Sequence, residues 1–149
     1  MEIERKWLIH HCPLDLSQYR CHQIAQGYLC TEPVIRIRRQ DNSYILTYKS
    51  AGLLSREEYN LPLNREAYEH LIPKTDGILL SKRRYVIPIE NNLTIELDYF
   101  DAPYETLCLA EIEFPTEEAA NAYQAPKWFG EDVTYSGQYH NSTLSKGHF

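Results

Sequence analysis

The sequence predicts a mainly β protein of the α+β class, an eight-stranded antiparallel β-barrel with a charged interior and a few helices packed outside. Segments that alternate polar and apolar residues follow one another with little room for helix between them. Short turn sequences join neighbouring segments, which favours antiparallel pairing. One face of nearly every segment is ionic, and eight strands are about enough to close a barrel that gathers such faces around one axis.

Composition and charge limit the classes of protein. The chain has 149 residues, of which 43% are hydrophobic, so it fits one domain over residues 1–149 with a buried core. The net charge of −6 argues against general attraction to nucleic acid or to an anionic membrane, and we expect neither partner. No apolar run approaches the roughly 20 residues of a membrane span. Because the charged start also lacks the apolar core of a signal peptide, we expect a cytoplasmic location.

The strands can be justified in chain order. In the first, residues 2–10, Glu2 and Lys6 point to one face while Ile3 and Trp7 point to the other. The same period-2 alternation predicts seven further strands, at residues 22–29, 34–40, 43–49, 56–63, 78–87, 93–100 and 107–114.

Turn sequences connect two pairs of these strands. Asp41 and Asn42 make a short turn between the third and fourth strands, which is a strong hairpin signal. Glu90, Asn91 and Asn92 do the same between the sixth and seventh strands. The connectivity is therefore predicted to be largely antiparallel.

Two helices and one short helical segment complete the prediction. Asn64 is a good N-cap for a helix that Pro73 would stop. Thr116 is a second N-cap, followed by two glutamates that the helix dipole favours, and Pro126 would stop that helix. A short helical segment is predicted at Asn141 to Leu144 near the end of the chain.

The ionic faces hold equal numbers of acids and bases. Many strands carry a single sign, so that like charges lie two residues apart on one face. The acids are Glu2, Glu4, Glu58, Glu96, Asp98, Glu111 and Glu113, and the bases are Lys6, Arg36, Arg38, Lys49, Arg56, Lys82 and Arg84. Among the six histidines, only His22 has a place near this face.

Two explanations compete for this pattern. A sheet face in water predicts mixed signs and surface ion pairs worth roughly 0.2–1 kcal/mol each. Single-signed strands are better explained by convergence on ligands of opposite sign: phosphates on the basic strands, and a hard cation such as Mg²⁺ or Mn²⁺ on the acidic ones. In a closed barrel the charged face would lie inside. The apolar faces would then point outward, to be covered by the helices, by a second copy in a homodimer, or by both.

Seven short motifs in a fixed order extend this interpretation. They are ExExK (Glu2, Glu4, Lys6), RxR (Arg36, Arg38), Lys49, Arg56-x-Glu58, KxR (Lys82, Arg84), ExD (Glu96, Asp98) and ExE (Glu111, Glu113). The set resembles the CYTH-domain proteins of the triphosphate tunnel metalloenzymes. The resemblance implies a barrel that binds a triphosphate, a small anionic substrate, on its basic strands and a divalent metal on its acidic ones. Bacterial members of this size are similar to inorganic triphosphatases, which would cleave the substrate to diphosphate and phosphate.

The resemblance also implies roles for single residues. Lys49 would position or help activate the attacking water, or would bind a further phosphate. Tyr28 has a weaker claim, since a tyrosine at a strand end is more often a packing residue. Ligands of the metal, direct or through water, would be Glu2, Glu4, Glu111 and Glu113. The phosphate clamp would be Lys6, Arg36, Arg38, Lys82 and Arg84. Arg56, Glu58, Glu96 and Asp98 would form a supporting charge network, whose acids could instead hold a second metal.

Two departures from the family pattern and three alternative functions remain open. Asn60 stands where relatives often carry a second glutamate, and His140 stands where they often carry lysine. The first weakens a second metal site on that strand, and the second weakens a role for a C-terminal cation. The alternative enzymes are an organic triphosphatase, acting on thiamine triphosphate or nucleotides, and an adenylate cyclase. The non-enzyme alternative is a polyphosphate-binding module, which the presence of all four predicted metal carboxylates disfavours.

Overall fold

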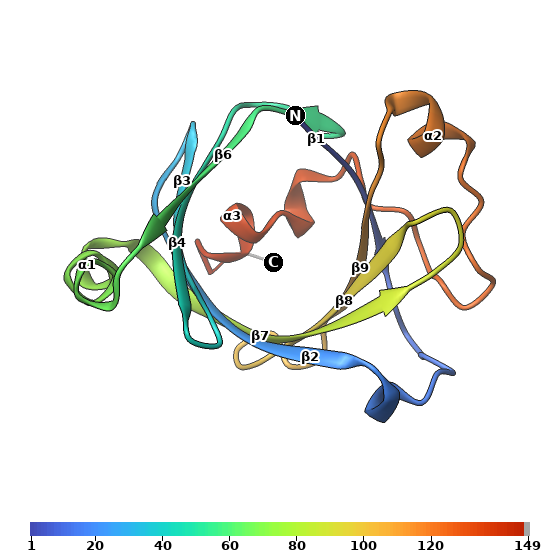
Figure 1. Cartoon of the computed structure of the whole chain (residues 1–149), viewed down its shortest axis with the longest axis horizontal. Coiled ribbons are helices and arrows are strands. Elements are labelled where there is room, and N and C mark those ends of the chain that lie inside the picture. The colour runs from blue at the N-terminus through green and yellow to red at the C-terminus, as the bar shows by residue number, and fades with distance from the viewer. Residues whose placement is uncertain (148–149) are drawn as a thin grey trace.

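A computed structural model describes residues 1–147, and its main feature is an antiparallel sheet that curls into a barrel (Figure 1). The strands are β1 (Glu2–Leu8), β2 (Arg20–Thr31), β3 (Val34–Gln40), β4 (Ser43–Lys49), β5 (Ser55–Arg56), β6 (Glu58–Leu63), β7 (Asp76–Pro88), β8 (Thr94–Phe100) and β9 (Cys108–Glu113). Their order in the sheet is β5-β1-β9-β8-β7-β2-β3-β4-β6, and every pair is antiparallel. The predicted mainly β, barrel-like class is confirmed.

The strand count differs from the prediction because the fifth predicted strand, 56–63, is two strands. β5 pairs with β1, where Arg56 lies opposite Glu2, and β6 pairs with β4, where Glu58 lies opposite Lys49. Only Glu57 separates them, so the chain passes there from one edge of the sheet to the other. The break is local, because the backbone of Glu57 bonds to Ser50: its carbonyl accepts from the Ser50 amide at 3.0 Å, and its amide donates to the Ser50 hydroxyl at 2.9 Å. This step brings the two edges of the barrel together.

Two helices lie outside the barrel on opposite sides of it, as predicted (Figure 1). Asn64 caps α1 (Arg65–Leu71), since its Oδ1 accepts a hydrogen bond of 2.7 Å from the Ala67 amide. Thr116 caps α2 (Glu117–Ala122) through a bond of 3.0 Å from the Ala119 amide. Single 3-10 turns occur at Leu16–Gln18 and at Ile72–Lys74, after α1. Among the described helices, none is long and apolar enough to cross a membrane.

The C-terminal segment, residues 137–146, folds toward the barrel axis rather than outside it (Figure 1). It contains a 3-10 turn (Gly137–Tyr139) and the predicted short helix, α3 (Asn141–Leu144). Several bonds attach it to the barrel; for example, the Tyr104 hydroxyl donates to the Leu144 carbonyl at 2.7 Å, and the Ile78 amide donates to the Ser145 carbonyl at 2.6 Å. The segment that contains α3 thus differs from α1 and α2, which lie outside the barrel as predicted.

The apolar side chains form two separate clusters. One lies on the outer faces of β1, β8 and β9, where Trp7, Leu97 and Ile112 pack together and α2 adds Ala120. The other cluster fills the end of the barrel reached by the C-terminal segment. It is formed by Leu80, Phe100, Tyr104, Leu107, Leu109, Val133 and Leu144. Leu144 is completely buried there because inward-facing side chains of β7, β8 and β9 surround it.

Candidate active site

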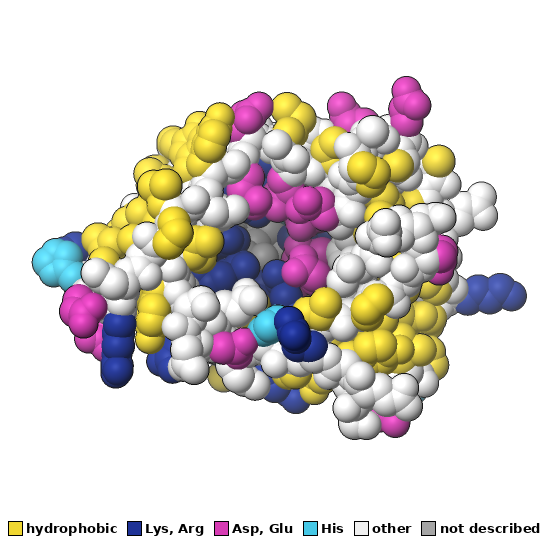
Figure 2. Space-filling view, in the orientation of Figure 1, with side chains coloured by type: hydrophobic (Ala, Val, Ile, Leu, Met, Phe, Trp, Pro, Cys, Tyr) yellow, Lys and Arg dark blue, Asp and Glu magenta, His cyan; other side chains and the backbone are white. Residues whose placement is uncertain are grey.

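The charged part of the barrel interior encloses a cavity of about 260 Å³. Figure 2 shows it as a hollow with acidic side chains on one wall and basic side chains on the facing wall. The wall includes every predicted site residue except Lys82 and Asp98, and it also includes Tyr28. The prediction of a charged interior is thus met by residues from all nine strands of the sheet and from the C-terminal segment.

Three carboxylates converge on the acidic wall. Glu4 of β1, Glu96 of β8 and Glu111 of β9 each offer an oxygen, and these oxygens lie within 4.8 Å of one another. Burial, together with the charges of Glu111 and Glu2, raises the pKa of Glu4 well above its ordinary value. The buried Oε1 of Glu111 has no hydrogen-bond partner in the described part of the chain. This acidic group could therefore hold a metal ion.

The acidic group overlaps only partly with the predicted ligand set. Glu4 and Glu111 belong to both, whereas Glu96 was assigned to the supporting network. Glu2 is instead engaged by two cations: Lys49 Nζ lies 3.0 Å from both carboxylate oxygens, and Arg56 Nε lies 3.3 Å from one. Lys49 is also 3.4 Å from Glu58. Glu113 lies opposite Glu4 in the sheet and lines the cavity, but its exposed carboxylate is outside the group.

The basic wall carries two guanidinium groups without a carboxylate partner. Arg36 and Arg38 of β3 are 7% and 9% exposed, and neither forms an ion pair within residues 1–147. Arg36 donates to the Thr47 hydroxyl at 3.2 Å, while its Nε has no partner among the described residues. Arg38 donates to Gln26 at 2.8 Å. Burial and the neighbouring Arg36 and Arg84 lower the pKa of Arg38 to about 9. Such uncompensated buried charge favours an anionic ligand.

These features match a known family. The sequence model of the CYTH domain family matches residues 1–147. The chain belongs to the CYTH domain family. It is 39% identical over 147 residues to an inorganic triphosphatase of Nitrosomonas europaea, covering 97% of this chain and 96% of that one. It is 34% identical over 150 residues to an inorganic triphosphatase of Acetivibrio thermocellus, covering 97% and 93%. A solved inorganic triphosphatase has a TM-score of 0.72 and 35% identity, covering 98% of this chain and 95% of that one.

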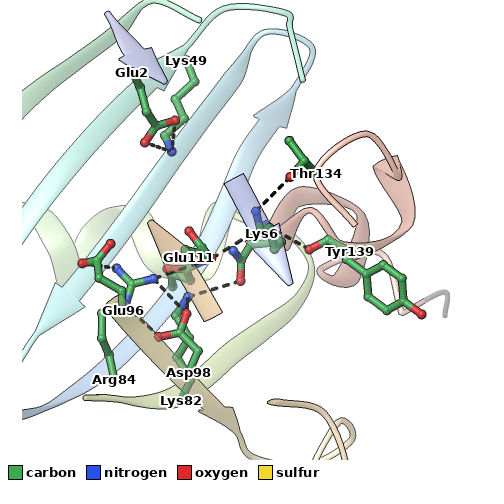
Figure 3. Close-up of polar contacts among 12 residues, drawn as sticks. Glu2, Lys6, Lys49, Lys82, Arg84, Glu96, Asp98, Glu111, Thr134 and Tyr139 are labelled. Carbon is green, nitrogen blue, oxygen red and sulfur yellow. Dashed lines mark hydrogen bonds and ion pairs between the residues drawn. The ribbon is translucent and has the colours of Figure 1, made fainter. Parts of the chain in front are cut away.

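Arg84 of this CYTH domain lies beside the acids Glu96 and Asp98 (Figure 3). It makes two bonds to Asp98, of 2.7 and 2.8 Å, and a third to Glu96 of 3.2 Å. Lys82 shares Asp98, at 2.7 Å, and both of these side chains are fully buried. Burial, with Arg84 and Arg38 nearby, lowers the pKa of Lys82 to about 7 against the attraction of Asp98. Lys82 does not line the cavity because it lies level with Phe100, where the barrel interior becomes apolar.

The C-terminal segment supplies residues that the sequence reasoning missed. His140 and Asn141 line the cavity of this CYTH domain, and the ammonium of Lys6 donates to the Tyr139 carbonyl at 3.1 Å. Burial and the cations Lys6 and Arg56 lower the pKa of His140 to about 4. His22 lies outside the cavity, with Nδ1 2.6 Å from Asp41. The expectation that His22 is the histidine nearest the site is therefore wrong, because the inward fold of residues 137–146 brings His140 there instead.

Proposed function

We propose that this CYTH domain hydrolyses inorganic triphosphate to diphosphate and phosphate. The observation that carries the proposal is the pair Arg36 and Arg38, buried cations without a carboxylate partner among residues 1–147 that face a group of three carboxylates. A small anion with several phosphoryl groups fits both features. Its oxygens would bind the two arginines, and a metal ion would fit between its oxygens and the carboxylates. The names of the two sequence relatives support the same substrate.

Glu4, Glu96 and Glu111 would hold a divalent cation, Mg²⁺ or Mn²⁺. Carboxylate oxygens are the ligands that these hard ions prefer, and Glu111 Oε1, which has no hydrogen-bond partner among residues 1–147, could bind one. When bound, the ion neutralises phosphate oxygens and activates water. Contact through water remains our prediction for Glu2 and Glu113. Glu2 is already held by Lys49 and Arg56, so it also keeps these cations in place.

The basic side chains would bind and orient the substrate. Arg36 and Arg38 have free donor capacity toward the cavity, and Arg84 and Lys6 complete the clamp at its acidic side. Cations fixed in place before the reaction stabilise the charge that develops on the transferred phosphoryl group and on the leaving oxygen. Lys82 would act indirectly, since it shares Asp98 with Arg84.

Lys49 keeps two roles in this proposal. Its ammonium donates to both oxygens of Glu2 and lies close to Glu58, an arrangement that fits a fixed cation. As a fixed cation it would orient the attacking water or contact a phosphate. No covalent nucleophile is required, because phosphoryl transfer to water needs mainly positioning and charge stabilisation.

A second cavity favours one alternative function, that of an organic triphosphatase. It measures about 430 Å³ and shares Val34, Arg56, His140 and Ser142 with the charged cavity. Its remaining wall includes the less polar side chains of Pro33, Tyr48, Ala51 and Leu53. An organic group attached to a triphosphate, such as thiamine or a nucleoside, would fit this kind of wall. Polyphosphate binding without turnover, a homodimer and a cytoplasmic location remain predictions from the sequence.

Metal dependence gives a direct test. We expect the purified protein to release phosphate from inorganic triphosphate only when Mg²⁺ or Mn²⁺ is present, because the ion at the acidic group would neutralise phosphate oxygens and activate the attacking water. Excess chelator should abolish release, and added metal should restore it. The measurement is colorimetric phosphate release, with protein that has been heated and denatured as the blank. Equal rates in excess chelator would remove the metal from the proposal.

A further inference from the structure

Lys6 is held by residues that follow the barrel in sequence. Its backbone amide donates to Thr134 Oγ1 at 3.0 Å, and its carbonyl accepts from the Val133 amide at 2.8 Å. Its ammonium donates to the Tyr139 carbonyl at 3.1 Å, as Figure 3 shows. Residues 133–139 therefore fix both the backbone and the charged end of Lys6, along the edge of β1 that does not pair with β9.

Thr134 is oriented by Asp132. The Thr134 hydroxyl donates its one proton to Asp132 Oδ1 at 2.6 Å, and the Thr134 amide donates to the same oxygen at 2.9 Å. Because the hydroxyl proton is taken by the carboxylate, a lone pair faces the amide of Lys6. Thr134 is 3% exposed, so water does not compete well for this contact.

Arg5 in turn holds Asp132 from outside the barrel. Its Nη2 lies 2.7 Å from Asp132 Oδ2, and its Nη1 donates to the carbonyls of Ala120 at 2.8 Å and Tyr123 at 2.9 Å. The guanidinium also lies 4.6 Å from the centre of the Trp7 ring. Arg5 stands between Glu4 and Lys6 on β1 and points to the opposite face. Its contacts thus fix the strand that carries both of these site residues.

We propose that Thr134, oriented by Asp132 and Arg5, is a positioning residue that places Lys6 for binding the triphosphate. Thr134 does not line the cavity. It acts by holding β1 so that the Lys6 ammonium stays on the Tyr139 carbonyl, 3.8 Å from Glu111 Oε1, where it can reach a phosphate. The inference takes its substrate from the proposed function, and small displacements of a positioned group have large effects on binding and rate.

Three variants test this role. Thr134→Val removes the hydroxyl at nearly constant shape, and Thr134→Ser keeps the hydroxyl. Thr75→Val makes the same chemical change outside the cavity and away from β1, where the Thr75 hydroxyl donates to the Ile72 carbonyl at 2.7 Å. We expect Thr134→Val to raise the Kd for inorganic triphosphate, measured by calorimetry without metal, and its KM with Mg²⁺ by about tenfold. Thr134→Ser should stay within about twofold of the wild type, and Thr75→Val should lower Tm without changing Kd.

Each outcome decides the question. An unchanged Kd in Thr134→Val, or a Kd in Thr134→Ser as weak as that in Thr134→Val, would make Thr134 merely structural. If Thr134→Val does not fold, Asp132→Asn replaces it: we expect a Kd about threefold weaker, and an unchanged Kd overturns the inference. If the wild type binds triphosphate without hydrolysing it, the proposed function fails while the Kd comparison still stands. No binding by the wild type would overturn both.

Discussion

Glu4→Gln is expected to lower the rate of phosphate release from inorganic triphosphate by about a hundredfold or more, while the protein stays folded and still binds the anion. The amide keeps the shape of the side chain but is a weaker, neutral ligand for a hard cation. Burial and the charges of Glu111 and Glu2 raise the pKa of Glu4, which favours the protonated, neutral carboxyl group when no metal is bound. The neutral amide of glutamine resembles this form. Turnover with Mg²⁺ and Kd without metal are the two measurements.

Two further glutamine variants locate the metal. Glu96→Gln should reduce turnover as strongly as Glu4→Gln, because both residues belong to the acidic group. Glu113→Gln should have a smaller effect, since its carboxylate lies outside that group. Full turnover with unchanged metal affinity in Glu4→Gln would show that the acidic group is not the metal site. A larger effect from Glu113→Gln than from Glu96→Gln would place the metal nearer to Glu113.

Arg38→Ala is expected to weaken triphosphate binding by about ten- to a hundredfold, because a charge-assisted contact to phosphate is lost. Thermal stability should be unchanged or higher. Burial and the charges of Arg36 and Arg84 lower the pKa of Arg38 to about 9, so the folded state disfavours this cation and alanine relieves the repulsion. Calorimetric titration measures the Kd, and a thermal scan of the same samples measures Tm.

Arg39→Ala is the matched control for Arg38→Ala. Arg39 is the next residue of β3 and lies on the outer face, where its Nε donates to the Asp41 carbonyl at 2.8 Å. Both variants remove one positive charge. If triphosphate binds in the cavity, its affinity should fall only in Arg38→Ala. Equal losses would mean that the net charge of the protein governs binding. Full affinity in Arg38→Ala would make this arginine a structural residue.

The side of each strand could be predicted from the sequence. Period 2 fixes which residues share a face, so Arg36 and Arg38 of β3, like Glu111 of β9, lie inside as expected. The caps Asn64 and Thr116 also start their helices, since these are local contacts within four residues. Such features depend on neighbouring residues and not on the rest of the fold.

The level of each residue along the barrel axis could not be predicted. Tilt and shear decide which residues of different strands meet, and no single strand contains that information. Glu96 therefore joins Glu4 and Glu111, while Glu2 of the same face lies beside Lys49. Lys82 belongs to the predicted face too, yet it lies outside the cavity, level with Phe100 of the apolar end of the barrel.

One signal in the sequence was overlooked. Four of the charged motifs have an apolar residue two positions beyond one end. Toward the C-terminus, Leu8 follows Lys6 and Phe100 follows Asp98; toward the N-terminus, Leu80 precedes Lys82 and Leu109 precedes Glu111. These inward-facing residues predict an apolar end of the barrel that needs a cover. The cover, Leu144 of α3, was not predictable in the same way because a helix of four residues has no amphipathic period of its own.

Arg36 and Arg38, which form no ion pair within residues 1–147, are proposed to bind inorganic triphosphate for cleavage at the acidic group of three carboxylates. The most direct test is phosphate release by the wild-type protein from inorganic triphosphate, longer polyphosphate, ATP and thiamine triphosphate at equal concentrations with Mg²⁺. We predict that kcat/KM for inorganic triphosphate exceeds every other value by about tenfold or more, a difference of about 1.4 kcal/mol in transition-state stabilisation. A higher value for ATP or thiamine triphosphate, or no release from any of the four, would contradict the account.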